Sequence, residues 1–187
     1  MQITTSIGLR RAAALTAAAL SLTATITLPV TAAHATGIHL LCTGQQSPTY
    51  SPPLTNTTQQ TTVNITETYG TSLHCLDTAG IQSGSGTFTV SEPASCTSLT
   101  QPGTVSYFNT YTWNNGQSST IHFTNVNVAR LLDGTTQVIA SGTVSSGFGL
   151  GDTAARTVTL PQLDPTLCST TGVASQQGVA TMTFISA

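Results

Sequence analysis

The fold is indicated most clearly by residues 104–128, which read TVSYFNTYTWNNGQSSTIHFTNVNV. In the first half of this stretch large aromatic residues alternate with polar ones. Tyr107, Tyr111 and Trp113 therefore fall on one face of an extended strand. Asn115-Gly116 follows, and this dipeptide is the strongest short-range signal for a two-residue type I′ turn. The stretch predicts an antiparallel β-hairpin.

The return strand of this hairpin contains a change of register. Ile121 and Phe123 alternate with polar residues, but the next apolar residues, Val126 and Val128, have the opposite parity. An extra residue in one strand of an antiparallel pair has this effect. We therefore expect a bulge or bend near Thr124-Asn125.

Similar short runs rich in Val, Ile, Thr and aromatic residues recur between turn residues along the chain. Besides the two strands of the hairpin they cover residues 61–69, 86–90, 137–144, 156–160 and 179–185. None of the segments after residue 35 has a helical period. Seven or eight strands predict an all-β fold, a single antiparallel β-sandwich that is immunoglobulin-like in general architecture. A closed barrel is the alternative.

The N-terminal residues have the pattern of a secretory signal peptide. Arg10 and Arg11 precede an uncharged run at 12–30, and Ala33-His34-Ala35 places small residues where a signal peptidase reads them. We expect residues 1–35 to be removed on export and residues 36–187 to form one secreted domain, free or held at the cell surface, that is not inserted in a membrane.

The remaining chain is almost uncharged. Lysine is absent, so the predicted mature chain carries two arginines against six acids, a formal net charge of −4. Nucleic-acid binding needs many cations to neutralise phosphates, which two arginines cannot supply. The same shortage excludes an anionic membrane surface as a partner. Recognition must use shape, hydrogen bonds or aromatic contacts.

Four cysteines in an exported chain predict two disulfides. They are Cys42, Cys75, Cys96 and Cys168, which allow three pairings. If residues 45–51 and 60–70 form a hairpin, Cys42 and Cys75 lie at its open end and Cys96 lies at the far end of the next strand. This geometry favours Cys42–Cys75 and Cys96–Cys168. No C-x-x-C spacing supports a metal or redox site instead.

A weak internal repeat relates residues 54–65 to residues 150–160, with Leu73-His-Cys75 matched by Leu167-Cys168. Coincidence in a chain rich in Thr and Gly explains the match equally well. If the repeat is real, two related halves flank the central hairpin.

No motif for catalysis, a cofactor or a metal is present. His39, His74 and His122 occur without a G-x-S-x-G elbow or an H-E-x-x-H pair. His122 is expected on the solvent face of its strand. Each of the three aspartates of the C-terminal half, Asp133, Asp152 and Asp164, lies in a turn context. We therefore predict no catalytic residues, no cofactor and no metal.

Four segments resemble small secreted Thr/Gly-rich β proteins of streptomycetes and other actinobacteria. They are Thr49-Tyr-Ser-Pro-Pro-Leu-Thr55, the Ser/Gly-rich residues 83–87, Thr112-Trp-Asn-Asn-Gly116 and residues 142–151. The resemblance implies export and a β fold. It carries no functional residue.

Three functions fit these expectations. The first is a non-enzymatic extracellular binding or cell-surface module of unknown ligand or protein partner. The second is a secreted protease inhibitor acting through an exposed loop at 47–53 or 92–97. The third is a small-molecule carrier similar to the enediyne chromoproteins, whose compact disulfide loops are not matched here.

Tyr107, Tyr111 and Trp113 are the candidate ligand platform. We expect their face to be buried, because few other large residues could fill a core. If it is exposed instead, the three rings form a flat surface suited to sugar rings or an apolar ligand.

Overall fold

The computed structural model describes residues 37–70, 75–97 and 103–186. These residues contain ten β-strands and one short helix. The predicted signal peptide, residues 1–35, lies outside them. No helix within the described residues is long and apolar enough to cross a membrane. The elements are β1 (Ile38–Leu54), β2 (Gln59–Tyr69), β3 (Leu76–Asp77), β4 (Gly84–Ala94), β5 (Gly103–Trp113), β6 (Ser118–Arg130), β7 (Thr136–Gly147), β8 (Thr153–Leu160), α1 (Pro165–Ser169), β9 (Val173–Ser175) and β10 (Gly178–Ile185).

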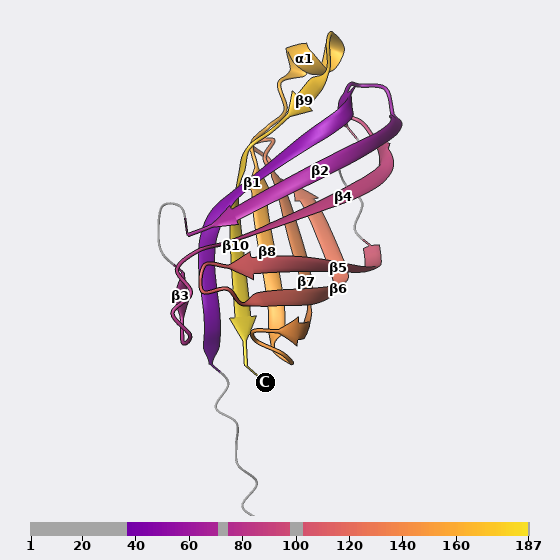
Figure 1. The fold of residues 1–187 in the computed structure, drawn as a ribbon. Coiled ribbons are helices and arrows are strands. Elements are labelled where there is room, and N and C mark those ends of the chain that lie inside the picture. The colour runs from indigo at the N-terminus through magenta and orange to yellow at the C-terminus, as the bar shows by residue number, and fades with distance from the viewer. Residues whose placement is uncertain (1–36, 71–74, 98–102, 187) are drawn as a thin grey trace, which may run out of the picture. The chain divides into compact units, whose positions relative to one another are not determined.

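Eight of these strands close into one antiparallel barrel (Figure 1). In the order β1, β2, β4, β5, β6, β7, β8, β10 each strand pairs with the next, and β10 pairs back to β1. The first part of β1 lies beside β10, with Leu40 opposite Phe184. Its second part lies beside β2, with Tyr50 opposite Val63. The short strands β3 and β9 add to β1 outside this cycle.

The prediction of an all-β protein is confirmed, but the prediction of an immunoglobulin-like sandwich is wrong. A sandwich consists of two sheets, whereas here the 17-residue β1 joins the two ends of the strand order into one sheet. Strands of both architectures alternate inward and outward residues, so the sequence pattern is the same for both. The closed barrel, the alternative, is the fold that the structure shows.

The predicted central hairpin is formed by β5 and β6. Residues 114–117 connect the two strands, and the Trp113 amide donates to the Gln117 carbonyl at 2.9 Å across a loop of three residues, 114–116, rather than the expected two. The amide of Gly116 donates to the Trp113 carbonyl at 3.0 Å, and Gly116 has a φ of +82°. A type I turn followed by a left-handed glycine is the usual three-residue hairpin loop.

The expected irregularity in β6 is confirmed. The ladder between β6 and β7 shifts register between Phe123 and Asn125. Before the shift Ile121 and Phe123 are fully buried, and after it Val126 packs against the same core. The bulge therefore keeps apolar side chains directed into the barrel although their parity in the sequence changes.

Two clusters of buried side chains fill the interior at different levels. The larger packs around the first half of β1 and includes Leu40, Tyr69, Trp113, Phe123 and Phe184. The smaller packs around the second half of β1 and includes Tyr50, Leu54, Cys96, Leu163 and Cys168. Their separation leaves room between them for the cavity described below.

The two disulfides join Cys42 to Cys75 and Cys96 to Cys168, so the favoured pairing is confirmed. The hairpin on which that prediction depended is present, because residues 44–51 of β1 pair with residues 62–69 of β2. The first bridge holds β1 to the connection that follows β2. The second holds the segment after β4 to α1, across 72 residues of sequence.

Residues 47–53, proposed above as an exposed inhibitory loop, lie within β1. Ser47, Pro48, Thr49, Tyr50 and Ser51 each face a residue of β2 in the antiparallel ladder. The Pro-rich composition suggested a loop, but a proline is accommodated wherever a strand's ladder does not need its amide. The segment at 92–97 is also not a free loop: its first residues end β4, and Cys96 is buried in its disulfide.

The short helix α1 was not predicted. Asp164, expected in a turn, is its N-cap, and its carboxylate accepts hydrogen bonds from the amides of Thr166 and Leu167. A helix of five residues is too short to show a period in the sequence.

The internal repeat stays a prediction. Its two segments have similar local settings, since residues 54–65 run from the end of β1 into β2 and residues 150–160 run from a turn into β8.

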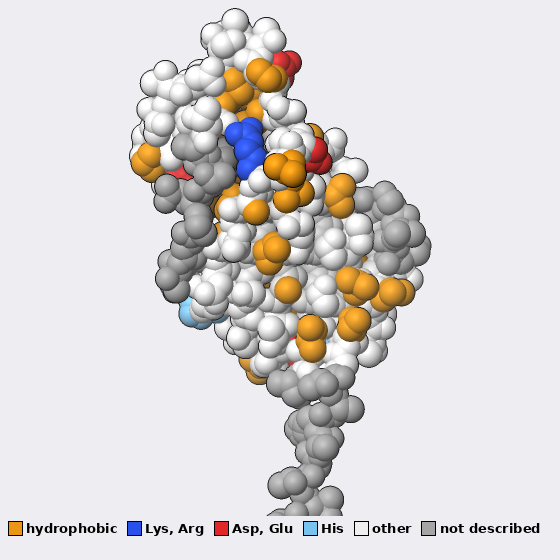
Figure 2. All heavy atoms as spheres, turned by 180° about the vertical axis from the view of Figure 1, so that it is seen from behind, with side chains coloured by type: hydrophobic (Ala, Val, Ile, Leu, Met, Phe, Trp, Pro, Cys, Tyr) orange, Lys and Arg blue, Asp and Glu red, His pale blue; other side chains and the backbone are white. Residues whose placement is uncertain are grey.

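The outer surface has little charge on the face that Figure 2 shows. Hydrophobic side chains appear there as separate spots among uncharged polar atoms. Among the described residues the exposed large hydrophobics include Leu76, Phe108, Leu132 and Leu150, which come from different parts of the chain.

The contact between β4 and β5 gives a first testable prediction. A Cβ on Gly86 would lie 2.6 Å from the ring of Tyr111, so Gly86→Ala forces that ring or the strand to move. We expect the free energy of unfolding to fall by about 1–3 kcal/mol, the usual cost of overpacking. The neighbouring exposed Ser85→Ala is the control and should change it by less than about 0.5 kcal/mol. Urea unfolding measures both; equal effects would contradict this account of the β4–β5 contact.

Candidate functional site

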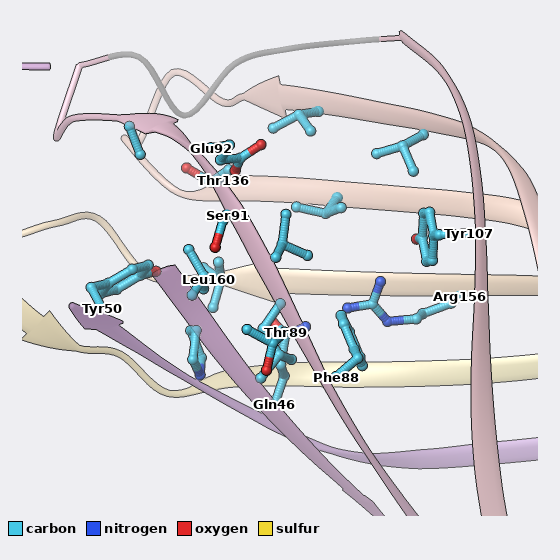
Figure 3. A pocket seen from close by; sticks show the side chains of 18 of the residues that line it. Gln46, Tyr50, Phe88, Thr89, Ser91, Glu92, Tyr107, Thr136, Arg156 and Leu160 are labelled. Atoms are coloured by element: carbon cyan, nitrogen blue, oxygen red, sulfur yellow. The ribbon is translucent and has the colours of Figure 1, made fainter. Parts of the chain in front are cut away.

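The barrel contains a cavity of about 670 Å³ between its two clusters of buried side chains (Figure 3). Seven of the eight barrel strands, all except β10, contribute to its lining. Most of the lining is apolar, and its main apolar side chains are Val63, Ile65, Phe88, Tyr107, Val126, Val128, Val138 and Leu160. Closed barrels of eight strands are just wide enough to hold one small ligand.

Among the described residues, the cavity opens where β4 and β5 separate. These strands pair only at Gly84, Ser85 and Gly86, opposite Trp113, Thr112 and Tyr111. Beyond Gly86 the ladder between them ends, although β4 stays paired with β2 up to Ala94. Residues 88–94 of β4 all contribute to the cavity lining, including the exposed Ser91 and Glu92. The cavity therefore reaches the surface along this part of β4.

Two glycines bring β4 and β5 together before they separate. The ring of Trp113 lies over Gly84 and the ring of Tyr111 lies over Gly86, where a Cβ would be 2.2 Å and 2.6 Å from the ring atoms. Glycine in a strand interior often marks such a close approach. The closed part of the β4–β5 wall is thus fixed by aromatic rings seated on glycine.

The floor of the cavity is formed in part by Arg156, which belongs to a buried ion pair; its partner Glu67 is not part of the lining. Arg156 of β8 donates from Nε to Oε1 of Glu67 of β2 at 2.6 Å, and the side chains are 4% and 0% exposed. The strands β2 and β8 are not neighbours, so the pair crosses the inside of the barrel.

Neutral donors complete the hydrogen bonding of the Glu67 carboxylate. Gln46 donates to Oε1 at 2.8 Å, and the hydroxyls of Tyr69 and Tyr111 donate to Oε2 at 2.9 Å each. A buried charge is tolerated when it is paired and its remaining lone pairs are occupied. Both conditions are met here.

The surroundings hold each of these groups in one protonation state. Burial opposes the charge of Arg156, but the Glu67 carboxylate and the nearby tyrosines outweigh it and raise its pKa. Burial, followed by the charge of Glu67, raises the pKa of Tyr69 and of Tyr111 well above the usual value. The arginine therefore stays charged and the tyrosines stay neutral donors throughout the ordinary pH range.

Part of the Arg156 guanidinium faces the cavity. Its carbon lies 5.0 Å from the centroid of the Phe88 ring, a cation–π contact, and Tyr107 lies beside it in Figure 3. Burial raises the pKa of Tyr107 and the nearby guanidinium only partly opposes the rise, so this hydroxyl is also neutral. The floor thus combines an aromatic surface with N–H and O–H donors.

The candidate aromatic platform divides between core and cavity. Tyr111 and Trp113 are 0% and 2% exposed, so these two rings are core, as expected. Trp113 also donates from Nε1 to Ser119 at 2.9 Å. Tyr107 is half-buried and lines the cavity. No outward platform is formed by these three residues.

Sequence reasoning missed the two charged residues of the floor, although a signal for them was present. Glu67 has the parity of Val63, Ile65 and Tyr69 along β2. Arg156 has the parity of Val158 and Leu160 along β8. A charge at an inward position of an alternating strand marks a buried polar site.

The other candidate residues lie outside the cavity lining. His39 Nδ1 is 2.7 Å from Oδ2 of the buried Asp152, and its ring packs on Phe148. His122 bonds Ser106 at 2.9 Å and stacks on the exposed Phe108.

Two other residues singled out in the sequence are His74 and Asp133. His74 lies outside the described residues. Asp133 binds Thr135 in its turn, as expected. Among the described residues no group of three or more His, Cys, Asp or Glu side chains is placed to hold a metal ion.

No protein-family model, curated protein or solved structure matches the chain. The function must therefore be inferred from the cavity itself.

The buried tyrosines predict a loss of stability at alkaline pH. Unfolding lets tyrosines ionise near pH 10, whereas burial raises the pKa of all four in the folded protein. The contribution of these tyrosines to the free energy of unfolding is complete below pH 10. It falls as the pH rises above 10, by about 1.4 kcal/mol per pH unit for each tyrosine. Urea unfolding between pH 8 and 11 should show a flat region followed by a fall. Tyr111→Phe should make the fall shallower, and an unchanged slope would contradict the assignment.

Proposed function

We propose that this chain is a secreted, non-enzymatic binding protein that holds a small, largely apolar molecule inside its barrel. The cavity carries the proposal. Its volume of about 670 Å³ is within the range of small-molecule sites, which are mostly apolar with a few placed polar groups. Here the polar groups are Arg156 and Tyr107 at the floor, opposite walls of valine, isoleucine and leucine.

The rigidity of the cavity supports binding. Five of its lining residues are valines, whose branched side chains have few rotamers to lose when a ligand binds. The floor is fixed by the hydrogen bonds that surround Glu67. A preformed site loses less conformational entropy on binding than one that must first be ordered.

The chemistry of the lining supports a non-enzymatic role. The described lining residues include no histidine and no cysteine, and their one carboxylate, Glu92, is exposed at the rim. Export is supported by the predicted signal peptide and by the two disulfides, which persist in oxidising compartments.

Filling the cavity tests this function. Val138 of β7 lines the cavity, while the next residue, Ile139, is 41% exposed on the outer face of the same strand. The purified protein should bind the uncharged dye N-phenyl-1-naphthylamine saturably, with a rise in fluorescence. We expect Val138→Trp to weaken binding by about tenfold or more, because the indole occupies the ligand's space.

Ile139→Trp is the matched control and should leave the affinity unchanged, and circular dichroism should show that both variants keep the β fold. Lack of saturable binding by the unaltered protein would overturn the proposed function. Equal weakening by both substitutions would show that the dye binds outside the cavity.

A further inference from the structure

The floor of the cavity is electrically neutral although it contains two full charges. Arg156 and Glu67 compensate each other at 2.6 Å, and both oxygens of Glu67 are already occupied by donors. The tyrosines around them are neutral, since burial raises their pKa. A ligand that brought an anion to this floor would create a net negative charge away from water.

The floor also has more hydrogen-bond donors than acceptors. Guanidinium has five N–H donors. Its Nε donates to Glu67 and it also bonds the Tyr107 side chain, which leaves further N–H donors without a partner among the described residues. Tyr107 places its hydroxyl beside the guanidinium. Buried donors without acceptors are costly, so an acceptor on the ligand would be favourable.

The entrance adds a second reason to exclude anions. Glu92 is exposed at the rim, and the predicted mature chain has a net charge of −4. The single cation of the described lining, Arg156, is already paired with Glu67. Nothing in the described lining therefore compensates a carboxylate on its way in or at the floor.

From these observations we infer that the cavity selects an uncharged ligand with a carbonyl or similar acceptor at the end that reaches Arg156 and Tyr107, and discriminates against carboxylates of the same shape. This inference rests on the proposed function and specifies its ligand class. A carboxylate that accepted from the remaining donors of Arg156 would share its single positive charge with Glu67, which leaves a net negative charge at the buried floor. A ketone, ester or amide oxygen accepts from the free donors and leaves the ion pair intact.

Three probes with one ring system test the inference. They are the ketone 6-propionyl-2-(dimethylamino)naphthalene, the anion 6-(dimethylamino)-2-naphthoate and N,N-dimethyl-2-naphthylamine, which has no carbonyl. At pH 7.5 the purified protein should bind the ketone at least about tenfold more tightly than either of the others. Fluorescence titration measures all three affinities.

Two variants assign the preference to the floor. Arg156→Lys keeps a cation for Glu67 but removes the planar donor group, and Tyr107→Phe removes one hydroxyl and little else. Each should reduce the advantage of the ketone over the probe without a carbonyl to about threefold or less. Tyr107→Phe is informative even if Arg156→Lys does not fold.

The outcomes separate the two proposals. Binding of the anion as tight as that of the ketone would overturn the inference and leave the binding function standing. Equal affinity for the ketone and the probe without a carbonyl would overturn the role of the acceptor. Absence of binding by all three probes would overturn the binding function, and the inference with it.

Discussion

One buried ion pair determines how the inside of this barrel is used. Glu67 and Arg156 come from strands that are not neighbours, and with Gln46 and Tyr111 they connect four strands across the interior. Removing either charge would leave the other uncompensated in the core, which is strongly destabilising. The full chain has only ten Lys, Arg, Asp and Glu residues, so two of them in the interior form a large share.

The ion pair also lies at the boundary between the packed core and the cavity. On one side Tyr69, Tyr111 and Trp113 form part of a dense aromatic core. On the other side the inward residues are mostly valine and other aliphatics, which are too small to meet across eight strands and so leave the cavity. The bulge in β6 contributes directly, because it directs Val126 and Val128 into that space. Core and cavity are thus two consequences of side-chain size along the same strands.

Local features of the fold could be predicted from the sequence, and global ones could not. The central hairpin, the irregularity near Thr124 and the disulfide pairing follow from alternation, turn residues and short-range geometry. Closure depends on β1 pairing with both β10 and β2, which alternation does not encode. The cavity depends on the separation of β4 from β5 after Gly86, a tertiary event. In the sequence, only the inward parity of Glu67 and Arg156 indicated the cavity. That parity can be interpreted only when the strands are known to enclose an interior.

The separation of β4 from β5 has a mechanical consequence. Along the cavity β4 has a strand partner on one side only, yet neither of its ends is free. One end is held against β5 by the rings seated on its glycines, and the chain just after the other end is tied to α1 through Cys96 and Cys168. A strand held at both ends can bend in its middle, but neither end can move away from the barrel. A ligand that enters beside this part of β4 therefore passes a strand that is fixed at both ends.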